Sequence, residues 1–486
     1  MKRKRTIYFN DARHYYLFVH EPPMRLEDAW GPVDEVAGTG IDTFVYGVSR
    51  DDGLFYPSRI GKRFGDGEPL TMSAYWRVWH NMQSLIDRGL DPLTVLIERA
   101  HEQGMEFIAS QRMGAFPGAG QNVAQRDGGQ GMADDAVRDH QFGVLRELAL
   151  DYPTDGIELD FAAAPMGTDW WVPTADLQRH APMMTDFMRR VRSMAHEKTG
   201  TPALIGARVY PTRELNAASG LEVEIWIEEG LVDYVVPLVY GYMTLDPNMP
   251  IQWLVDAAAD TETSVYAMLQ PYYSEENRPL TQRIYASAAM YRAAASNAWK
   301  VGVDGLYAWF MHWPLGSGER SILTELAHPE QLARKDRHYV LRREVEATGD
   351  HDYPAQLPLA FDPASDLGKP RQIHFTIAES VADEPNATKV NLRLAFTDLV
   401  AADRLALSLN GQSLADVPLR RWPMREIDPY SGQWVELDLR SIPPTCGQNV
   451  LEVTLLERPS DLPGTLILED VELLIGYDTY ADTPLG

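Results

Sequence analysis

The chain has 486 residues, enough for two or three domains, and its 70 acidic and 44 basic residues give a formal net charge of −26. Hydrophobic residues make up 45% and charged residues 23% of the chain, which is typical of globular proteins and excludes a disordered one. The single cysteine, Cys446, excludes an intramolecular disulfide and any metal site built from several cysteines.

The basic residues do not indicate a nucleic-acid or membrane partner. Lys2–Arg5 is the one dense basic run, whereas a phosphate-binding surface needs clustered Lys and Arg. The residues after it are too polar for a signal peptide, and no stretch approaches the roughly 18 apolar residues of a transmembrane helix. We therefore expect neither partner and a cytoplasmic location for the chain as written, or a secreted one if an export signal was removed.

Short runs of apolar, β-branched and aromatic residues recur in the first two thirds of the chain and predict strands. They are 7–9, 43–48, 106–109, 156–161, 203–207, 234–240, 264–269 and 305–310. Segments with helical periodicity lie between them, such as Asp91–Gln103 and Arg283–Ala295. This alternation predicts an α/β fold, a (β/α)₈ TIM barrel. A doubly wound open sheet is the alternative, but no strand is followed by the G-x-G-x-x-G motif of dinucleotide binding.

The pattern changes after about Pro329. Residues 335–346 predict polar connecting structure, and strands then follow one another at short spacing. They are 372–377, 389–396, 404–409, 433–439, 449–456 and 465–475. The sequence therefore predicts a barrel over residues 1–345 and an antiparallel, jelly-roll-like β-sandwich over 346–486. We expect the sandwich to be mainly structural and to pack against the barrel, because the connection between them is short.

The fourth predicted strand carries the most informative side chains. Strand alternation places Glu158 and Asp160 on one face, about 6–7 Å apart, at the barrel end where active sites lie. Two inward carboxylates are costly to bury unless they are neutralised or used. One interpretation is a structural ion pair with Arg112 or Arg208. The other is catalysis, because an arginine that keeps one carboxylate ionised lets its neighbour hold a proton, as glycoside hydrolysis requires.

Polar and aromatic side chains at the other strand ends complete the predicted site. Flat rings with polar edges suit sugar faces, so we expect a carbohydrate substrate. The expected substrate-binding residues are Asn10, Asp11, Arg112, Arg208, Tyr240, Tyr242, Trp170, Trp171, Trp309 and His312. The histidines are scattered and form neither H-x-H nor H-E-x-x-H, so we expect no metal and no other cofactor.

Several ordered motifs resemble those of a known family. Asp91–Ala109 resembles its helix-to-strand segment, and Asp155–Asp160, followed by Pro165, resembles its fourth strand. Val232–Tyr240 is similar to its sixth strand, although Leu238 stands where Gln is usual, and 302–310 resembles the closing strand. The family is that of the bacterial glycosyl-hydrolase-like family ten barrels, and the resemblance covers about residues 5–330.

This resemblance implies a glycosidase-like barrel in which Asp160 is the key carboxylate and Tyr240 lines the site, followed by an accessory sandwich module. In the more distant chitinase-type barrels the fourth strand ends in a catalytic Glu, but Ala162 stands there in this chain. We therefore do not expect their substrate-assisted catalysis. The second acid is then Glu158 itself, Glu275 beyond the seventh strand or Asp11 beyond the first.

The sequence as a whole predicts a glycoside hydrolase acting on a poly- or oligosaccharide. Asp160 is the expected nucleophile or base, Glu158 is either the acid/base or an electrostatic partner, and Arg112 and Arg208 anchor hydroxyls or an acidic sugar. Two alternatives stay open: a barrel that binds glycan without cleaving it, and another barrel enzyme such as a lyase or isomerase. A metal requirement would favour the second of these.

Overall fold

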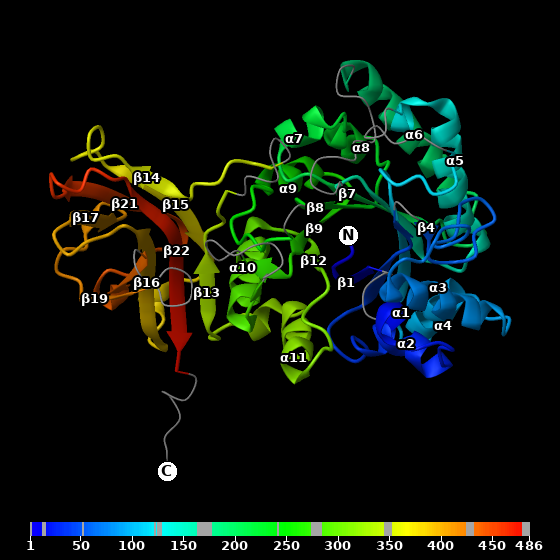
Figure 1. Ribbon diagram of the computed structural model, residues 1–486, viewed down its shortest axis with the longest axis horizontal. Helices are drawn as coiled ribbons and strands as arrows, with labels where there is room; N and C mark the ends of the chain where they lie inside the picture. The colour runs from blue at the N-terminus through cyan, green and yellow to red at the C-terminus, as the bar shows by residue number, and fades with distance from the viewer. Residues whose placement is uncertain are drawn as a thin grey trace, which may run out of the picture.

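The computed structural model describes residues 2–11, 16–50, 53–120, 123, 129–162, 177–240, 243–273, 284–344, 352–423 and 432–478. Two parts lie side by side along its longest axis, a barrel surrounded by helices and a set of antiparallel strands (Figure 1). No helix in the described part of the chain is long and apolar enough to cross a membrane.

Eight parallel strands close into the barrel in the order β1-β12-β9-β8-β7-β6-β5-β2. Their bounds are β1 Arg5–Asp11, β2 Thr43–Gly47, β5 Glu106–Arg112, β6 Gly156–Asp160, β7 Leu204–Val209, β8 Tyr234–Pro237, β9 Ser264–Leu269 and β12 Gly305–Ala308. Each of the predicted runs in the first part of the chain supplies one of these strands, so the (β/α)₈ prediction is confirmed. Because the strands are parallel, their carboxyl ends meet at one mouth of the barrel.

Helices surround the barrel. Their bounds are α1 Tyr16–Val19, α2 Leu26–Asp34, α3 Ser73–Ile86, α4 Pro92–Glu102, α5 Asp135–Arg146, α6 Leu177–Ala195, α7 Arg213–Ala218, α8 Val223–Glu228, α9 Gln252–Ala258, α10 Ala288–Val301 and α11 Ser317–Leu326. The predicted helix over Asp91–Gln103 is α4, which starts where the Asp91 side chain accepts hydrogen bonds from the first free backbone N–H groups.

The helix predicted over 283–295 begins later than expected. Ile284–Tyr285 forms strand β11, which pairs with β10 (Tyr272–Tyr273), and α10 starts only after Ser287 caps its N-terminus. A second short hairpin, β3 (Ser49–Arg50) with β4 (Gly53–Leu54), follows β2. Both hairpins belong to the loops at the mouth of the barrel.

The C-terminal part is an antiparallel β-sandwich. One sheet has the order β13-β22-β16-β20-β19 with β14 also on β22, and the other has the order β15-β21-β17-β18. The bounds are β13 Arg337–Val340, β14 Leu359–Phe361, β15 Arg371–Ile377, β16 Ala387–Thr397, β17 Arg404–Leu409, β18 Gln412–Ser413, β19 Leu419–Pro423, β20 Gly432–Asp438, β21 Gly447–Glu457 and β22 Leu466–Tyr477. Side chains from both sheets, such as Phe375 and Leu394, form one apolar core.

The expectation of polar connecting structure over 335–346 is wrong for Arg337–Val340, which is strand β13. Its charged residues are paired rather than solvated, because Arg337 binds Glu379 and His338 lies beside Glu472 of β22. Helix α10 of the barrel packs against β13 and β15, and Ala293 of that helix is part of the sandwich core. The two parts therefore share a packed boundary, visible between α10 and β13 in Figure 1.

Candidate functional site

Strand β6 ends at the barrel mouth with two carboxylates on its inner face. Glu158, the deeper one, is 0% exposed. Its Oε1 accepts hydrogen bonds from Ser110 at 2.8 Å and Tyr307 at 3.1 Å, and its Oε2 accepts one from Tyr234 at 3.1 Å. Burial raises the pKa of Glu158, and the neighbouring Arg208 guanidinium only partly offsets this. Protein donors occupy both oxygens, so Glu158 is held as an internal anchor.

Arg208 of β7 joins the two carboxylates. Its Nε lies 2.8 Å from Glu158 Oε1, as an ion pair without hydrogen-bond geometry, and its Nη1 donates to Asp160 Oδ2 at 3.1 Å. Nη2 donates to the Tyr307 hydroxyl, and the guanidinium carbon lies 3.8 Å from the centre of the Phe9 ring. Burial acts to lower the pKa of Arg208, but the surrounding anionic groups raise it, so the guanidinium stays charged.

A second arginine–carboxylate pair lies at the same mouth. Arg112 at the end of β5 donates to Asp11 Oδ2 at 2.9 Å and to the Tyr240 hydroxyl at 3.3 Å. Burial raises the pKa of Tyr240; Asp11 and Asp160 act in the same direction, and Arg112 opposes them. The four groups are therefore close enough to feel one another's charge, and they form one polar cluster.

Trp309 closes one side of this cluster. Its ring meets Phe9 edge-on at 4.9 Å and lies 5.7 Å from the Tyr240 ring. The indole is buried, and among the described residues its Nε1 finds no hydrogen-bond acceptor. A buried donor without a partner costs free energy, so this N–H needs an acceptor from water or from a ligand.

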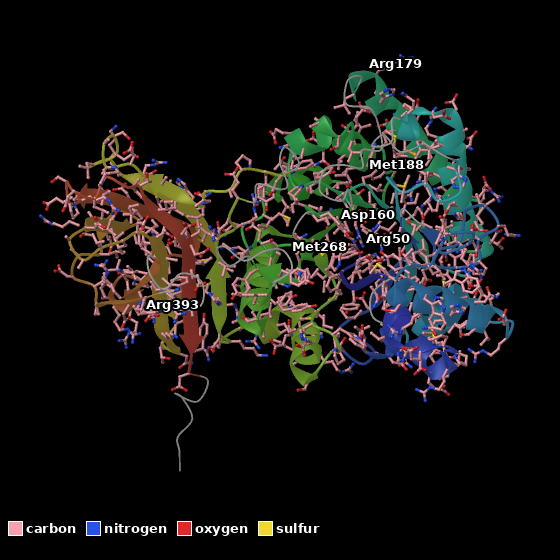
Figure 2. All side chains as sticks on the ribbon, in the orientation of Figure 1. Arg50, Asp160, Arg179, Met188, Met268 and Arg393 are labelled. Carbon is pink, nitrogen blue, oxygen red and sulfur yellow. The ribbon has the colours of Figure 1, made fainter. Side chains whose placement is uncertain are left out.

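Most of the predicted site residues that the structure describes come together in this way. The assembled residues are Asp11, Arg112, Glu158, Asp160, Arg208, Tyr240 and Trp309, and Figure 2 shows Asp160 inside the barrel half. Asn10 is buried, but strand alternation turns it away from the inward face that Asp11 occupies. His312 is exposed and meets the Tyr285 ring edge-on at 4.8 Å, apart from the cluster. Glu275, Tyr242, Trp170 and Trp171 lie outside the described residues.

Sequence reasoning missed the side chains that hold Glu158. Ser110, Tyr234 and Tyr307 each occupy an inward position of a barrel strand and donate to its carboxylate. Strand alternation is the signal that could have found them, because hydroxyl-bearing residues at inward positions need a partner inside the barrel. Tyr234 and Tyr307 lie within predicted apolar runs, and Ser110 directly follows the run 106–109, so the sequence analysis assigned none of them a role at Glu158.

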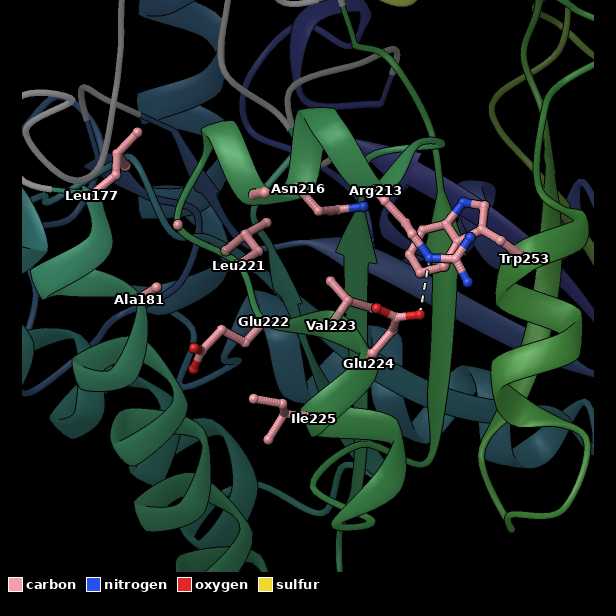
Figure 3. A pocket seen from close by; sticks show the side chains of 12 residues that line it. Leu177, Ala181, Arg213, Asn216, Leu221, Glu222, Val223, Glu224, Ile225 and Trp253 are labelled. Atoms are coloured by element: carbon pink, nitrogen blue, oxygen red, sulfur yellow. Dashed lines mark hydrogen bonds and ion pairs between the residues drawn. The ribbon is translucent and has the colours of Figure 1, made fainter.

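In the described part of the chain, no group of three or more His, Cys, Asp or Glu side chains is arranged to hold a metal ion. Two cavities lie beside the mouth. One, of about 480 Å³, is lined by helices α6 to α9 and bordered by the Arg213–Glu224 ion pair (Figure 3). The other, of about 600 Å³, lies between segments 62–75 and 116–120. Neither is lined by a residue of the polar cluster.

No family model matches this chain, and no curated protein sequence matches it either. Similar solved structures include the C-terminal domain of a candidate chitinase from Desulfitobacterium hafniense, with 13% identity, 68% of this chain and 100% of that one covered, and a TM-score of 0.42. Another is α-L-fucosidase isoenzyme 2 from Paenibacillus thiaminolyticus, with 10% identity, 67% of this chain and 49% of that one covered, and a TM-score of 0.41. A β-1,4-mannanase has 9% identity, with 67% of this chain and 99% of that one covered, and a TM-score of 0.39. The chain thus spans about half of that fucosidase. Similarities this distant decide neither substrate nor mechanism.

Proposed function

We propose that the barrel mouth binds a carbohydrate and hydrolyses its glycosidic bond, with Asp160 as the reacting carboxylate. The observation that carries this proposal is the ion pair of Asp160 Oδ2 with the fully buried Arg208, whose other contacts are with Glu158 and Tyr307. Arg208 places a fixed positive charge beside this carboxylate at the base of the site. A carboxylate at the mouth of a barrel can attack a sugar or activate water.

Of the two roles that the sequence left open for Glu158, we propose that of electrostatic partner. Both of its oxygens are occupied by hydroxyl donors and it is shielded from solvent, so it orients Arg208 instead of meeting the substrate. Asp11 then supplies the second carboxyl group from β1. Tyr240 and Trp309 offer a hydroxyl, a ring face and an unpartnered N–H to the sugar.

The test is Asp160→Asn, because the amide keeps the shape of the side chain and cannot ionise. We expect turnover to fall by roughly 10⁴-fold or more, as it does when a catalytic group is removed. Hydrolysis of a panel of aryl glycosides and polysaccharides measures this, with circular dichroism to check the fold. Asp155→Asn is the matched control, because it makes the same change just before the start of β6, at the end of the strand opposite to Asp160. Near-wild-type turnover by Asp160→Asn would contradict the assignment.

A barrel that binds glycan without cleaving it is the second candidate. Both mouth carboxylates already have an arginine partner, so an arrangement that holds glycan without supplying a general acid fits the same contacts. In this case the wild type hydrolyses nothing in the panel, yet calorimetry detects glycan binding that Trp309→Ala weakens. The same panel therefore distinguishes the two functions.

A further inference from the structure

The loop between β8 and α9, residues 243–251, is tied to the barrel mouth at its first residues. Met243 N donates to the carbonyl of Tyr240 at 3.1 Å, so the loop begins in direct contact with a residue of the polar cluster. Leu245 N donates to Tyr272 O at 2.6 Å, and Tyr272 N donates to Met243 O at 3.2 Å. The start of the loop is thus fixed to residues that follow two neighbouring barrel strands, Tyr240 beyond β8 and Tyr272 in β10 beyond β9.

Further along, the same loop is anchored on the sandwich. Asn248 Oδ1 accepts a hydrogen bond from Thr376 N at 2.8 Å. Asn297 Nδ2, from helix α10, donates to Thr376 O at 2.8 Å and to Pro247 O at 2.9 Å. Thr376 lies on β15, an edge strand of its sheet, whose outer backbone groups need partners. Two asparagine side chains of the barrel part meet this need and hold the loop against the strand.

A buried charge cluster makes the second anchor. Tyr353 donates its hydroxyl hydrogen bond to Asp246 Oδ2 at 2.5 Å, and Arg342 Nε lies 3.8 Å from the same oxygen. Arg342 also binds Asp352 at 2.5 Å and lies 4.1 Å from the centre of the Tyr353 ring. Burial and the carboxylate of Asp246 raise the pKa of Tyr353, so its hydroxyl stays protonated and remains a donor. Asp246 therefore joins the loop to the segment that leads into the sandwich.

We propose that Asp246, Asn248 and Tyr353 are positioning residues through which the sandwich holds the 243–251 loop, and with it Tyr240, at the mouth of the barrel. The path runs from Thr376 and Tyr353 through the loop to the Met243–Tyr240 hydrogen bond. Its effect on substrate rests on the proposed function, whereas the anchoring of the loop does not. The sandwich then contributes to the site without touching the ligand.

Hydrogen exchange on the full-length chain tests the anchoring. Tyr353→Phe and Asn248→Ala each remove one anchor, and exchange over residues 243–251 should rise by about fivefold to tenfold, the factor that one ordinary hydrogen bond represents. In Asn248→Ala the amide of Thr376 should also exchange faster. The matched control is Tyr152→Phe, which removes a similar tyrosine–carboxylate hydrogen bond, to Asp91 at the start of helix α4. Unchanged exchange in both anchor variants, or an equal rise in the control, would overturn the proposal.

Kinetics on a glycan that the wild type hydrolyses test the effect on Tyr240. Both anchor variants should raise KM several-fold and leave kcat nearly unchanged. If they act through Tyr240, combining Tyr353→Phe with Tyr240→Phe should raise KM no further than Tyr240→Phe alone. Additive effects, or an unchanged KM despite faster exchange, would show that the anchors do not position Tyr240. A wild type that hydrolyses no glycan would contradict the proposed function, and the exchange measurement would then decide the anchoring by itself.

Discussion

Two fully buried arginines, Arg208 in the barrel and Arg458 in the sandwich, hold carboxylates in different ways. Arg458 binds Asp403 at 2.8 Å and donates its remaining hydrogen bonds to the backbone carbonyls of Asp398 and Leu462. Its partners come from two neighbouring loops. Arg208 instead contacts side chains from β1, β6 and β12 and directs Asp160 toward the mouth. A buried charge therefore does not by itself indicate a functional site. What distinguishes Arg208 is that one of its carboxylate partners, Asp160, lies at the mouth of the barrel.

The largest expected effect tests the Arg458–Asp403 pair of the sandwich. Asp403→Ala leaves the Arg458 guanidinium buried without its carboxylate, so the free energy of unfolding should fall by about 3–5 kcal/mol. Chemical denaturation measures this change, and activity per folded molecule should stay at the wild-type level. The control is Glu457→Ala, which breaks the exposed pair with Arg404 and should cost well under about 1 kcal/mol. Equal losses in the two variants would remove the distinction between the pairs.

A smaller effect tests how tightly the barrel cluster is packed. A Cβ at Gly206 would lie 2.0 Å from the ring of Tyr234, which donates to Glu158. Gly206→Ala should therefore displace Tyr234 and lower the free energy of unfolding by about 1–3 kcal/mol. Gly318→Ala, on helix α11 where a Cβ meets open space, should instead be neutral or slightly stabilising. A fully stable Gly206→Ala would show that the ring has room to move.

The last effect depends on pH and concerns Glu35, a partly buried carboxyl bound by hydroxyl and indole donors. It accepts hydrogen bonds from Tyr8 and Trp313, and burial raises its pKa to about 7. Because the folded pKa lies above the unfolded value near 4.5, the stability that the protonated form contributes is complete below about pH 4.5 and is lost as the pH rises to about 7. The loss is at most about 1.4 kcal/mol per pH unit.

Glu35→Gln keeps the shape of the protonated side chain and cannot ionise. Its stability relative to the wild type should therefore rise between pH 4.5 and pH 7, as thermal unfolding across this range would show. Parallel pH profiles for the two proteins would mean that Glu35 does not titrate in this window.

The fold could be predicted where hydrophobic periodicity is strong. All eight barrel strands and six of the sandwich strands correspond to runs of apolar or alternating residues. The predicted runs do not include β13, β14, β18 and β19. In β13 and β19 basic residues interrupt the apolar pattern, and their acidic partners Glu379 and Glu436 are brought beside them only by the fold, which periodicity does not record.

The sequence predicted the two carboxylates of the site but not which arginine pairs with them. Alternation placed Glu158 and Asp160 on one face, but it could not decide between Arg112 and Arg208, because both occupy strands next to β6 in matching register. Arg112 instead reaches Asp11 of β1 across β2, where Gly47 lies beside Asp11 and the Phe9 ring occupies the space that a larger side chain would take. This contact forms only when the barrel closes and brings β1 near β5, so the sequence alone does not predict it.

Strand β22 has a consequence for the order in which the protein is made. It pairs with β13, β14 and β16, yet it follows all other strands of the sandwich along the chain. At about 5–20 residues per second, roughly 6–25 s of translation separate β13 from its partner. All eight barrel strands are synthesised before this interval begins. During the interval the apolar faces of the incomplete sandwich sheet remain exposed to water. We therefore expect the speed of the ribosome between β13 and β22 to influence how much of the protein reaches its native state.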